Sequence, residues 1–565
     1  MKYIFVAGGV MSSVGKGVAA ASIGKVLQAR GLAVTAIKID PYVNVDAGTM
    51  NPTEHGEVYV LDDGTECDQD MGNYERFLDL DFSRANYMTT GSVYLEVITR
   101  ERNLGFGGRC VHVVPDIPLE VIKKINLAGK KKQADVVIIE IGGTIGDYQN
   151  VLFLEAVRLL KFKKPEDVLL ALVSYIPSLG SGGNELKTKP TQHAVRSLNS
   201  VGLRPDFVFG RAAVPLDEKR KEKLEFMCGL EKGSVISAPD VQNIYQIPLN
   251  FEKDELGSKI LKKLGLRSRV TDLTGWRKLE RTVRTASRTA DIAIVGKYFG
   301  TGNFVLTDSY ISVLEAIKHA CYANAALPKF SWVDSEQFEK DPKKLRELAR
   351  YSGIVVPGGF GSRGVEGIIR VVEYARKHKI PYLGLCYGMQ LAVVEFARHV
   401  AGLKSAHTTE IDSETPHPVI DILPEQREKL ARKDYGGSMR LGAYPAVLQA
   451  KSIAHMAYSK NKKDAQSKSL KHGNKPSALS GMLISERHRH RYEVNPDYIE
   501  KIEKAGGVFS GRSPDRRLME IFELPRSKHP FFLGTQFHPE FKSRPLSPHP
   551  LFVEFIKASI KKRAG

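Results

Sequence analysis

The chain is poor in cysteine and has no long hydrophobic run. Five cysteines lie far apart among its 565 residues and none forms a C-x-x-C pair: Cys67, Cys110, Cys228, Cys321 and Cys386. This spacing argues against a disulfide framework and against a structural zinc site. Hydrophobic stretches stay below the roughly 18 residues that a transmembrane helix needs, and the apolar run after Lys2 ends at Gly8, too early for a signal peptide. We therefore expect no membrane span, and a cytoplasmic protein.

Acidic residues are fewer than basic ones. Lys and Arg together number 83 and Asp and Glu 64, which gives a formal net charge of +19. Such an excess is compatible with a nucleic-acid partner, or with a solvated basic surface and sites for nucleotide phosphates. The basic residues are spread along the chain and no nucleic-acid-binding module is present. We therefore favour the second interpretation and expect no nucleic-acid partner.

Short Val/Ile-rich runs alternate with helix-length segments, as in an α/β fold with two doubly wound parallel-sheet domains. The runs that predict strands are VTAIKID (34–40), VVIIEIGG (136–143), LLALVSYI (169–176) and DFVFGRA (206–212), and a second series starts at DIAIVGKY (291–298). Between the two series the pattern lapses, which predicts a domain at 1–266, a linker with a short helix at 267–290 and a second domain at 291–565. The Lys-rich stretch 451–480 predicts a surface loop, either a solvated insertion or a docking site for a partner.

The stretch GGVMSSVGKG, from Gly8 to Gly17, follows an apolar run and is typical of a phosphate-binding loop, with two departures. The usual pattern G-x-x-x-x-G-K-[ST] has Gly at position 10, where this chain has Val10, and Ser or Thr after the lysine, where it has Gly17. Gly15 and Lys16 at a helix start still suit phosphate binding. Because Gly17 has no hydroxyl, carboxylates from elsewhere are the expected metal ligands.

Two acidic positions fit that expectation. Asp70 lies in ECDQDMGNYERF, and Glu140 ends a run that predicts a buried strand, where a charge is costly unless it meets a cation. Either acid could instead cap a helix or form a surface ion pair. A further polar and basic cluster, with Lys187, Lys189 and Gln192, lies in NELKTKPTQHAV and suits a second phosphorylated ligand.

In the second domain, GLCYG (384–388) places Cys386 between two glycines, after an expected strand and before an expected helix. Small neighbours permit the tight turn of a nucleophile elbow, and a helix N-terminus lowers the pKa of a thiol there. TQFHPE supplies His538 as a base and Glu540 to orient it, two residues apart on one side of an extended segment. VPGGFG contributes Gly358 and Gly359, whose backbone N–H groups can bind an oxyanion.

These three motifs together resemble the class I glutamine amidotransferase family over about residues 291–565. The resemblance implies glutamine hydrolysis through a thioester, with Cys386, His538 and Glu540 as the catalytic triad and release of ammonia. The oxyanion would lie on N–H groups near Gly359 and Tyr387.

The whole chain, from Met1 to about Ala558, resembles the CTP synthase family. The matching pieces are GGVMSSVGKG, KIDPYVNVDAGTMNPTEHGEV, CDQDMGNYERF, EIGGTIGD, KTKPTQH and RHRHRYEVN. The resemblance implies a P-loop-like synthetase domain followed by a glutamine amidotransferase domain. ATP would phosphorylate O4 of UTP, and ammonia would replace the phosphate to give CTP.

The resemblance also implies a role for each matching residue, with Lys16 and Lys38 on nucleotide phosphates. The expected ATP-binding residues are Ser13, Val14, Gly15, Lys16, Gly17, Val18, Asp70, Asp240 and Val241. UTP or the product CTP would contact Ser12, Asp147, Tyr148, Gln149, Lys187, Thr188, Lys189, Pro190, Thr191, Gln192 and Lys223. Glutamine would contact Gly359, Tyr387, Gly388, Met389, Gln390, Glu410 and Arg491. Asp70 and Glu140 would bind Mg²⁺, and an ammonia passage would be lined by Pro52, His55 and Val58.

The family's regulation and assembly are implied in the same way: activation by GTP, for which Arg363 is a candidate contact, inhibition by CTP, and homotetramers that can form filaments. Gln149 replaces the acid that many relatives carry near the pyrimidine, so feedback by CTP can differ here. Two other functions share some of these motifs. An amidotransferase acting on a cofactor-precursor carboxylate would not need the KTKPTQ cluster, and a non-catalytic scaffold would not need the triad.

Overall fold

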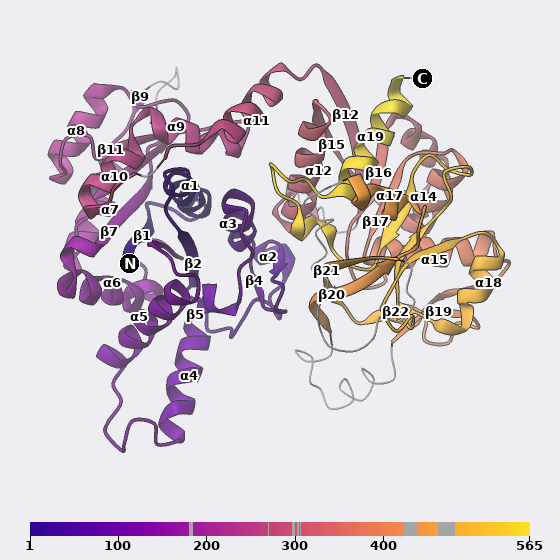
Figure 1. Ribbon diagram of the computed structural model, residues 1–565, viewed down its shortest axis with the longest axis horizontal. Helices are drawn as coiled ribbons and strands as arrows, with labels where there is room; N and C mark the ends of the chain where they lie inside the picture. Colours follow the sequence, from indigo (N-terminus) through magenta and orange to yellow (C-terminus); the bar gives the residue numbers. More distant parts are fainter. Residues whose placement is uncertain are drawn as a thin grey trace. The chain divides into compact units, whose positions relative to one another are not determined.

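The computed structural model describes residues 1–179, 185–268, 270–296, 300–301, 304–305, 307–422, 439–460 and 481–564. They form two compact units. The first comprises Met1–Thr49 and Asp70–Glu280, and the second Met50–Gln69 and Arg281–Gly565 (Figure 1). Among the helices within these ranges, none combines the length and the apolar character needed to cross a membrane.

A seven-stranded sheet forms the centre of the first unit, and all of its neighbouring strands run parallel. Its order is β11-β10-β7-β1-β6-β2-β5. The strands are β1 (Lys2–Gly9), β2 (Val34–Asp40), β5 (Tyr87–Thr89), β6 (Val136–Ile141), β7 (Val168–Tyr175), β10 (Phe207–Ala212) and β11 (Val235–Pro239). Because β6 and β7 follow one another in the chain but flank β1, the carboxyl end of β1 is a switch point, where such sheets bind ligands.

Helices cover both faces of this sheet. Tyr3, Phe5 and Ala7 of β1 belong to a core shared with helices α4 to α8, and the alternation along the strand turns Ile4 and Val6 to the other face, where α1 packs against α3, α9 and α10. The helices are α1 (Lys16–Gln28), α3 (Asp70–Leu78), α4 (Thr90–Arg102), α5 (Val113–Lys131), α6 (Val151–Lys163), α7 (Lys189–Ser200), α8 (Glu218–Cys228), α9 (Ile247–Lys253), α10 (Leu256–Leu264) and α11 (Thr274–Thr285). A two-stranded pair, β8 (Ser178–Leu179) and β9 (Glu185–Leu186), lies after β7.

A nine-stranded sheet forms the centre of the second unit, in the order β15-β12-β16-β17-β25-β24-β23-β20-β21. The first five strands are parallel, as expected, and the last four continue the sheet antiparallel, which the sequence patterns did not indicate. The strands are β12 (Arg288–Gly296), β15 (Ala326–Asp334), β16 (Gly353–Val356), β17 (Tyr382–Leu385), β20 (Arg440–Leu448), β21 (Met482–His490), β23 (Val508–Arg512), β24 (Met519–Glu523) and β25 (Phe532–Thr535).

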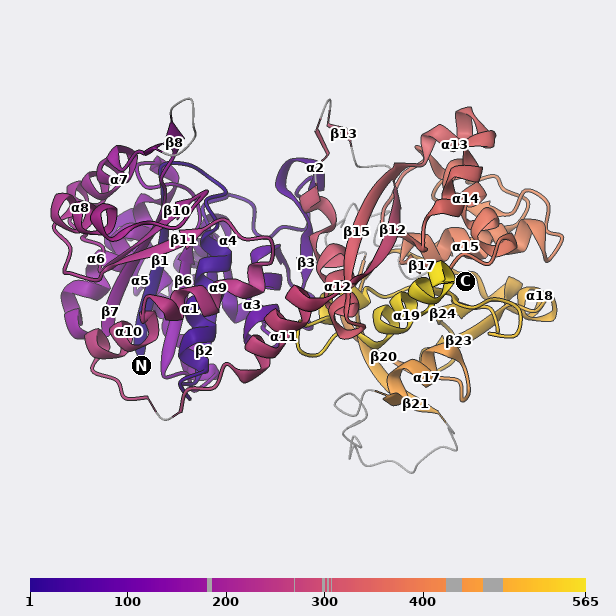
Figure 2. The ribbon, with the colours of Figure 1, turned by 90° about the horizontal axis from the view of Figure 1, so that it is seen from above.

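Two hydrophobic cores lie on the two faces of the second sheet. One contains α14 (Val365–Lys377) and α15 (Tyr387–His399), which lie together in Figure 2, and the other contains α12 (Ile311–Ala323), α17 (Ile453–Lys460) and α19 (Pro550–Ala564). Smaller elements complete this unit: β13 (Gly300–Thr301), β14 (Phe304–Val305), α13 (Glu336–Lys340), β18 (His407–Thr408), β19 (Pro418–Ile422), β22 (Tyr492–Val494) and α18 (Ile499–Lys504).

Residues 50–69 pack with the second unit, although the sequence patterns placed them in the first domain, at 1–266. They contain α2 (Pro52–His55) and an antiparallel hairpin of β3 (Val58–Val60) and β4 (Glu66–Asp68). Arg487 of β21 donates to Asp62 Oδ1 (2.5 Å), to the Val60 carbonyl (3.1 Å) and to the Tyr59 hydroxyl (3.1 Å). A long-range contact of this kind leaves no local signal in the sequence.

The expected strands are confirmed, with ends shifted by at most three residues. Two segments expected to lack core residues contribute some. In the predicted linker, Trp276 of α11 is buried, with its ring 5.2 Å from that of Phe77. In the Lys-rich stretch, 453–460 form helix α17 with Ile453 and Tyr458 in a core, so the expectation of a loop is wrong there. Residues 461–480 lie outside the described part of the chain.

Candidate active sites

The predicted phosphate-binding loop joins β1 to α1. Val10, Ser13 and Gly15 have φ values of 79°, 54° and 88°, and this left-handed turn brings the chain into α1 at Lys16. The N–H groups of the first helical turn have no carbonyl partners within the helix and are suited to an anion. The Lys16 ammonium donates to the Gly143 carbonyl (3.0 Å), which lies in the loop after β6.

The two predicted metal ligands lie together around a third residue. Lys38 Nζ, on β2, is 2.6 Å from Asp70 Oδ2 and 3.2 Å from Glu140 Oε1. It is also 3.5 Å from Asp40 Oδ1, and the Tyr74 hydroxyl donates to the other oxygen of Glu140. Asp40 and Tyr74 were not among the predicted site residues. Three carboxylates thus surround one ammonium group.

Burial dominates the electrostatics of this cluster. It raises the pKa of Glu140 to about 7, and the nearby charge of Asp70 adds to the effect. Burial also acts to raise the pKa of Asp70, but the ion pair with Lys38 and hydrogen bonds outweigh it and hold that pKa below its ordinary value. Burial lowers the pKa of Lys16. With three acids facing Lys38 and Lys16, the cluster can accept a further positive charge.

Most residues predicted to bind UTP or CTP lie after β6 and after β7, while Ser12 follows β1 and Lys223 lies in α8. The backbone N–H of Lys187 donates to the Pro177 carbonyl (2.9 Å), and Gln192 Nε2 donates to Thr188 Oγ1 (3.2 Å). The helix α7 starts at Lys189 and Pro190, and Thr191 accepts from Ser174. Ser12, Tyr148 and Gln149 are exposed, while Asp147 accepts from the backbone of Thr144. The hydrogen bond from Lys187 is the main cause that lowers the pKa of Glu185, and the charge of Lys223 contributes to the same effect. Lys223 therefore lies within electrostatic range of this segment.

A small apolar cavity of about 30 Å³ lies beside some of the residues predicted to bind ATP. Its lining includes Val14, Gly15 and Val18 from the loop and α1, and Arg211 and Pro239 from β10 and β11. Asp240, which is not among the lining residues, accepts from Arg211 Nε (2.8 Å), and Val241 follows it.

Cys386 forms a tight elbow between β17 and α15, with φ 50° and ψ −98°. Glycine is required on either side of Cys386 because a Cβ atom would not fit there. A Cβ on Gly388 would lie 2.3 Å from the Val356 carbonyl oxygen, and one on Gly384 would lie 2.6 Å from the Gly388 carbonyl carbon. The elbow places the thiol of Cys386 in a cavity of about 110 Å³.

His538 and Glu540 line the same cavity, and His538 Nδ1 lies 2.7 Å from Glu540 Oε1. Burial acts to lower the pKa of His538, but the Glu540 carboxylate and the Cys386 sulfur outweigh it and raise that pKa to about 10. The imidazole is thereby poised as the cation beside the sulfur. The other lining residues are Glu57, Val58, Ser309, Tyr310, Val313, Gly358, Gly359, Phe360, Arg489 and Phe541.

Of the residues predicted to bind glutamine, Gly359 lines this cavity, and two others contact the loop that carries it. Glu410 accepts from the backbone N–H of Gly361 (2.9 Å), and the Tyr387 hydroxyl donates to the Gly361 carbonyl (3.0 Å), so both hold the GGFG loop. Gly359 lines the cavity, and Arg491 lies in the bend after β21. Gly388 and Met389 belong to the first turn of α15, where the Met389 side chain is buried in the core and only its backbone can face a ligand.

The three residues expected along an ammonia passage lie in the segment 50–69. Val58 lines the cavity of Cys386, His55 Nδ1 is 3.9 Å from Asp68 Oδ2, and Pro52 begins α2. One functional contact was missed within a quoted motif: Gln536 of TQFHPE donates Nε2–H to Cys386 Sγ (3.7 Å).

The strand β21 was also missed as a site element. In RHRHR (487–491), Arg487 and Arg489 turn to the hairpin, where Arg489 pairs with Glu66 (2.8 Å), while His488 and His490 turn to a buried network on the other face. In the sequence, the alternation of Arg and His with a period of two was the signal from which this strand and its two faces could have been predicted.

Comparison with known proteins agrees with both units. Residues 2–266 match the family model of the CTP synthase N-terminus, and residues 305–558 that of glutamine amidotransferase class-I. The CTP synthase of Methanococcus maripaludis is 48% identical over 570 residues, with 100% of each chain covered, and that of Carboxydothermus hydrogenoformans is 48% identical over 561 residues, with 99% of each covered. A solved structure described as the Trypanosoma brucei CTPS glutaminase domain with bound acivicin is 36% identical, covers 48% of this chain and 94% of its own, and has a TM-score of 0.41.

The elbow cysteine and the matching family model define the second unit as a class I glutamine amidotransferase. The first family model and the full-length relatives go further: the chain belongs to the CTP synthase family. It is a glutamine-dependent ligase of pyrimidine biosynthesis, and the resemblance drawn from its motifs is confirmed.

Proposed function

We propose that the chain makes CTP from UTP, ATP and glutamine, with each unit carrying one half-reaction. The observation that carries the proposal is the cavity that holds Cys386, His538 and Glu540 together, in a chain whose other unit has a phosphate loop beside a carboxylate cluster. A scaffold protein has no use for that cavity, and the KTKPTQ segment at the end of β7 supports a pyrimidine nucleotide as the acceptor.

Glutamine hydrolysis begins with attack of the Cys386 sulfur on the side-chain amide carbon. The carbonyl oxygen becomes an oxyanion that the backbone N–H groups of Gly359 and Tyr387 stabilise. His538 gives its proton to the leaving nitrogen, so that ammonia departs and a thioester remains. His538 then accepts a proton from water, which attacks the thioester and releases glutamate and the thiolate. Glu540 remains charged throughout and orients the ring of His538.

In the first unit, O4 of UTP attacks the γ-phosphorus of ATP and ADP leaves. The N3 proton of UTP is lost when O4 is phosphorylated. Ammonia then attacks C4, inorganic phosphate departs as the leaving group, and the nitrogen loses one proton to solvent to become the 4-amino group of CTP. The Lys16 and Lys38 ammonium groups lie at the carboxyl ends of β1 and β2, where they offset phosphate charge. Water must be kept from the ammonia, because its protonated form is not nucleophilic.

The residues around Lys38 fit a magnesium ion. Carboxylate oxygens of Asp70 and Glu140 converge on the Lys38 ammonium, a positive group that already occupies their centre, and hard oxygen donors are what Mg²⁺ prefers. The chemistry that Mg²⁺ supplies there when bound is neutralisation of phosphate charge. Tyr74 holds Glu140, and Asn73 donates to Asp70 Oδ1 (3.1 Å), so that both acids are fixed in place.

The remaining family properties belong to the same proposal. Ser12, Asp147 to Gln149, Lys187 to Gln192 and Lys223 would hold UTP or the inhibitor CTP, and Pro52, His55 and Val58 would line the route of ammonia. GTP would activate glutamine use, and the chain would assemble as a homotetramer that can form filaments. Arg363, which pairs with Glu336, is the candidate GTP contact.

The test follows CTP formation by the absorbance change of the pyrimidine ring, with glutamine or with ammonium chloride as the nitrogen source. Cys386→Ala is expected to lose synthesis from glutamine and to keep synthesis from ammonium. Loss of both activities in a folded Cys386→Ala variant would overturn the division into two half-reactions. Retention of both would remove Cys386 from catalysis.

A further inference from the structure

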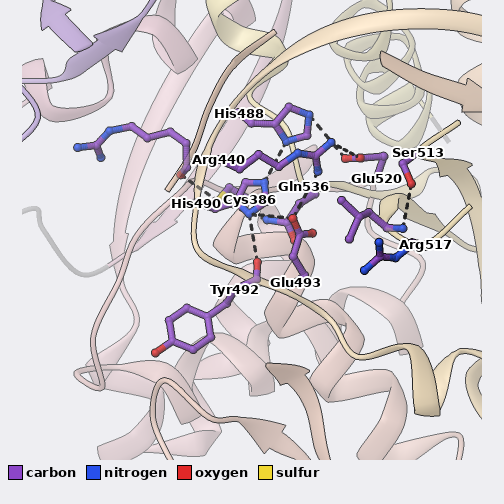
Figure 3. A network of polar contacts seen from close by, with 12 residues as sticks. Cys386, Arg440, His488, His490, Tyr492, Glu493, Ser513, Arg517, Glu520 and Gln536 are labelled. Carbon is purple, nitrogen blue, oxygen red and sulfur yellow. Dashed lines mark hydrogen bonds and ion pairs between the residues drawn. The ribbon is translucent and has the colours of Figure 1, made fainter. Parts of the chain in front are cut away.

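A second polar side chain, besides that of His538, lies against the Cys386 sulfur. Gln536, which follows β25, is fully buried, and its Nε2–H points to Cys386 Sγ at 3.7 Å (Figure 3). The sulfur also lies 3.9 Å from the Arg489 carbonyl, to which a neutral thiol can donate its proton. The thiol and the thiolate therefore each have a hydrogen-bond partner, and Gln536 is a neutral donor to the thiolate in addition to the His538 cation.

The neighbours of Gln536 fix which end of its amide faces the sulfur. The Tyr492 carbonyl can only accept, so Gln390 turns its Nε2–H to that oxygen (3.0 Å). The same NH₂ group of Gln390 lies 3.4 Å from Gln536, which must therefore present Oε1 there. Nε2 of Gln536 is left to face Cys386. The orientation follows from donor and acceptor pairing around the group.

The Tyr492 carbonyl, which accepts from Gln390, is itself positioned by two histidines. His490 Nδ1 lies 3.2 Å from that oxygen and must carry a proton to donate to it, which leaves His490 Nε2 as an acceptor. His488 Nδ1 lies 2.9 Å from His490 Nε2 and is the donor of this pair. Burial, and then the charge of Arg440, lower the pKa of both histidines well below the ordinary value, so both rings are neutral.

The far end of the network is anchored by charge. Arg440 of β20 pairs with Glu520 (2.7 Å) and with Glu493 (3.4 Å), and His488 Nε2 lies 3.6 Å from Glu520. The hydrogen-bond donors thus run in one direction from the histidines to the Tyr492 carbonyl. The Glu493 carboxylate also lies 3.6 Å from His490 Nδ1.

We propose that Gln536 is a catalytic residue of glutamine hydrolysis, whose Nε2–H stabilises the Cys386 thiolate, and that Gln390 and the His488–His490 pair are positioning residues for it. The inference rests on the proposed role of Cys386 as the nucleophile. The thiolate attacks in the first step and leaves in the last, when water displaces it from the thioester. A neutral donor stabilises that anion without offering it a proton, which His538 must keep for the ammonia.

The charged and titratable groups that face the thiol come from three segments and set the background against which Gln536 acts. They are His538 and Glu540 after β25, Arg489 on β21, and Glu57 ahead of β3. Gln536 is a neutral donor among them, so removing its N–H changes the hydrogen bonding of the sulfur without removing one of these charges.

Two variants remove the donor from Gln536. Gln536→Glu keeps the shape of the side chain and replaces the NH₂ group by an acceptor. Gln536→Met keeps the volume and has no charge, so it serves as the test variant if a buried carboxylate in Gln536→Glu disturbs folding. The matched control is Thr535→Val, which removes a buried donor one residue away whose partner is the Phe537 carbonyl and not the sulfur.

The first measurement is the rate of alkylation of Cys386 by iodoacetamide between pH 5 and 10, read from the mass of the Cys386 peptide because Cys110 is exposed and also reacts. We expect both Gln536 variants to raise the apparent pKa of the Cys386 thiol by about one to two units. The kcat of glutamine-dependent CTP formation should fall about 10- to 100-fold with little change in KM, while ammonium-dependent synthesis is kept. Thr535→Val should leave the thiol pKa unchanged.

The positioning residues are tested by His490→Asn and His490→Leu. Asparagine keeps an N–H near the place of Nδ1 and should retain most of the rate, whereas leucine should lower kcat in the same sense as Gln536→Met. An unchanged thiol titration and an unchanged kcat in both Gln536 variants would overturn the inference. Glutamine use that survives in Cys386→Ala would instead overturn the proposed function, so the two failures are distinguishable.

Discussion

The carboxylate of Asp70 lies where a side chain at residue 17 would begin: a Cβ on Gly17 would be 1.9 Å from Asp70 Oδ1. The usual phosphate loop has Ser or Thr at this position to bind the metal. Here a carboxylate from α3 takes the space that the hydroxyl would need. The absence of a hydroxyl at Gly17 and the presence of Asp70 are therefore one feature of the site.

Gly17→Ser should consequently inactivate the synthetase unit, although it restores the common motif. The new side chain must displace Asp70, and a shift of about 1 Å at a reacting site costs on the order of 100-fold in rate. We expect CTP formation from ammonium and from glutamine to fall by at least that factor. Ser22→Ala, in the same helix, removes a buried hydroxyl that has no partner among the described atoms and should leave both rates unchanged. A fully active Gly17→Ser enzyme would show that Asp70 is free to move.

Lys38→Met should make stability depend on magnesium. Removing the ammonium leaves Asp40, Asp70 and Glu140 facing one another without their shared counter-ion, and breaking such a buried pair costs about 3–5 kcal/mol. We expect a lower Tm in EDTA, and a rise on addition of MgCl₂ that exceeds the rise in the parent, since a bound cation stabilises by mass action.

The control for that experiment is the variant in which Lys38→Met is combined with Asp70→Asn and Glu140→Gln. It lacks the two carboxylates assigned to the metal and keeps only Asp40, so its Tm should respond little to MgCl₂. A Tm of Lys38→Met that is equally insensitive would count against a metal site between Asp70 and Glu140.

Local patterns in the sequence predict many residues of the two candidate sites, but not the more distant residues that pack against them. Apolar runs predicted the strands β2 and β6, and with them the positions of Lys38 and Glu140. The two glycines around Cys386 predicted the elbow because close approach of backbones excludes a Cβ there. Each of these features depends on neighbours within a few residues.

Features that depend on distant partners could not be predicted. The assignment of residues 50–69 to the second unit rests on pairs such as Asp62 with Arg487, which are 425 residues apart. Trp276 has charged neighbours in sequence, and its contacts with the distant rings of Phe77 and Tyr245 identify it as a core residue. Gln536 stands within a recognised motif, yet its contact with Cys386 depends on how two strands of the sheet align.

Glu540→Gln should change how stability varies with pH. The pKa of His538 is raised in the folded state to about 10, so its contribution to stability is fully present below the unfolded value of about 6.5 and is lost as the pH rises through about 10. Without the Glu540 carboxylate, that pKa returns toward its ordinary value and the contribution shrinks. We expect the parent Tm to fall by at least about 2 °C more than that of Glu540→Gln between pH 7 and 10. Parallel curves for the two proteins would contradict the charged state assigned to His538.

The hairpin that carries Val58 to the cavity of Cys386 should depend on one buried cation, Arg487. Its guanidinium is fully buried and is held by Asp62, Tyr59 and the Val60 carbonyl, while the side chain of Asp62 is 36% exposed. Burial acts to raise the pKa of Asp62, but Arg487 outweighs it and lowers that pKa, so the ion pair is complete at every pH well above 4 and is lost only as the pH falls below it.

Asp62→Ala leaves the Arg487 charge buried without its carboxylate partner and should lower the free energy of unfolding by about 2–3 kcal/mol. This loss is smaller than that expected for a fully buried ion pair, because water reaches Asp62. Arg487→Met removes the charge itself and keeps apolar volume, so adding it to Asp62→Ala should cost less than the sum of the two single changes. Urea unfolding of the four proteins measures this difference. Strictly additive losses would mean that Asp62 and Arg487 do not interact. In that case the hairpin would be held by the Tyr59 hydroxyl, which donates to the Phe541 carbonyl (2.7 Å), and Tyr59→Phe would become the destabilising change.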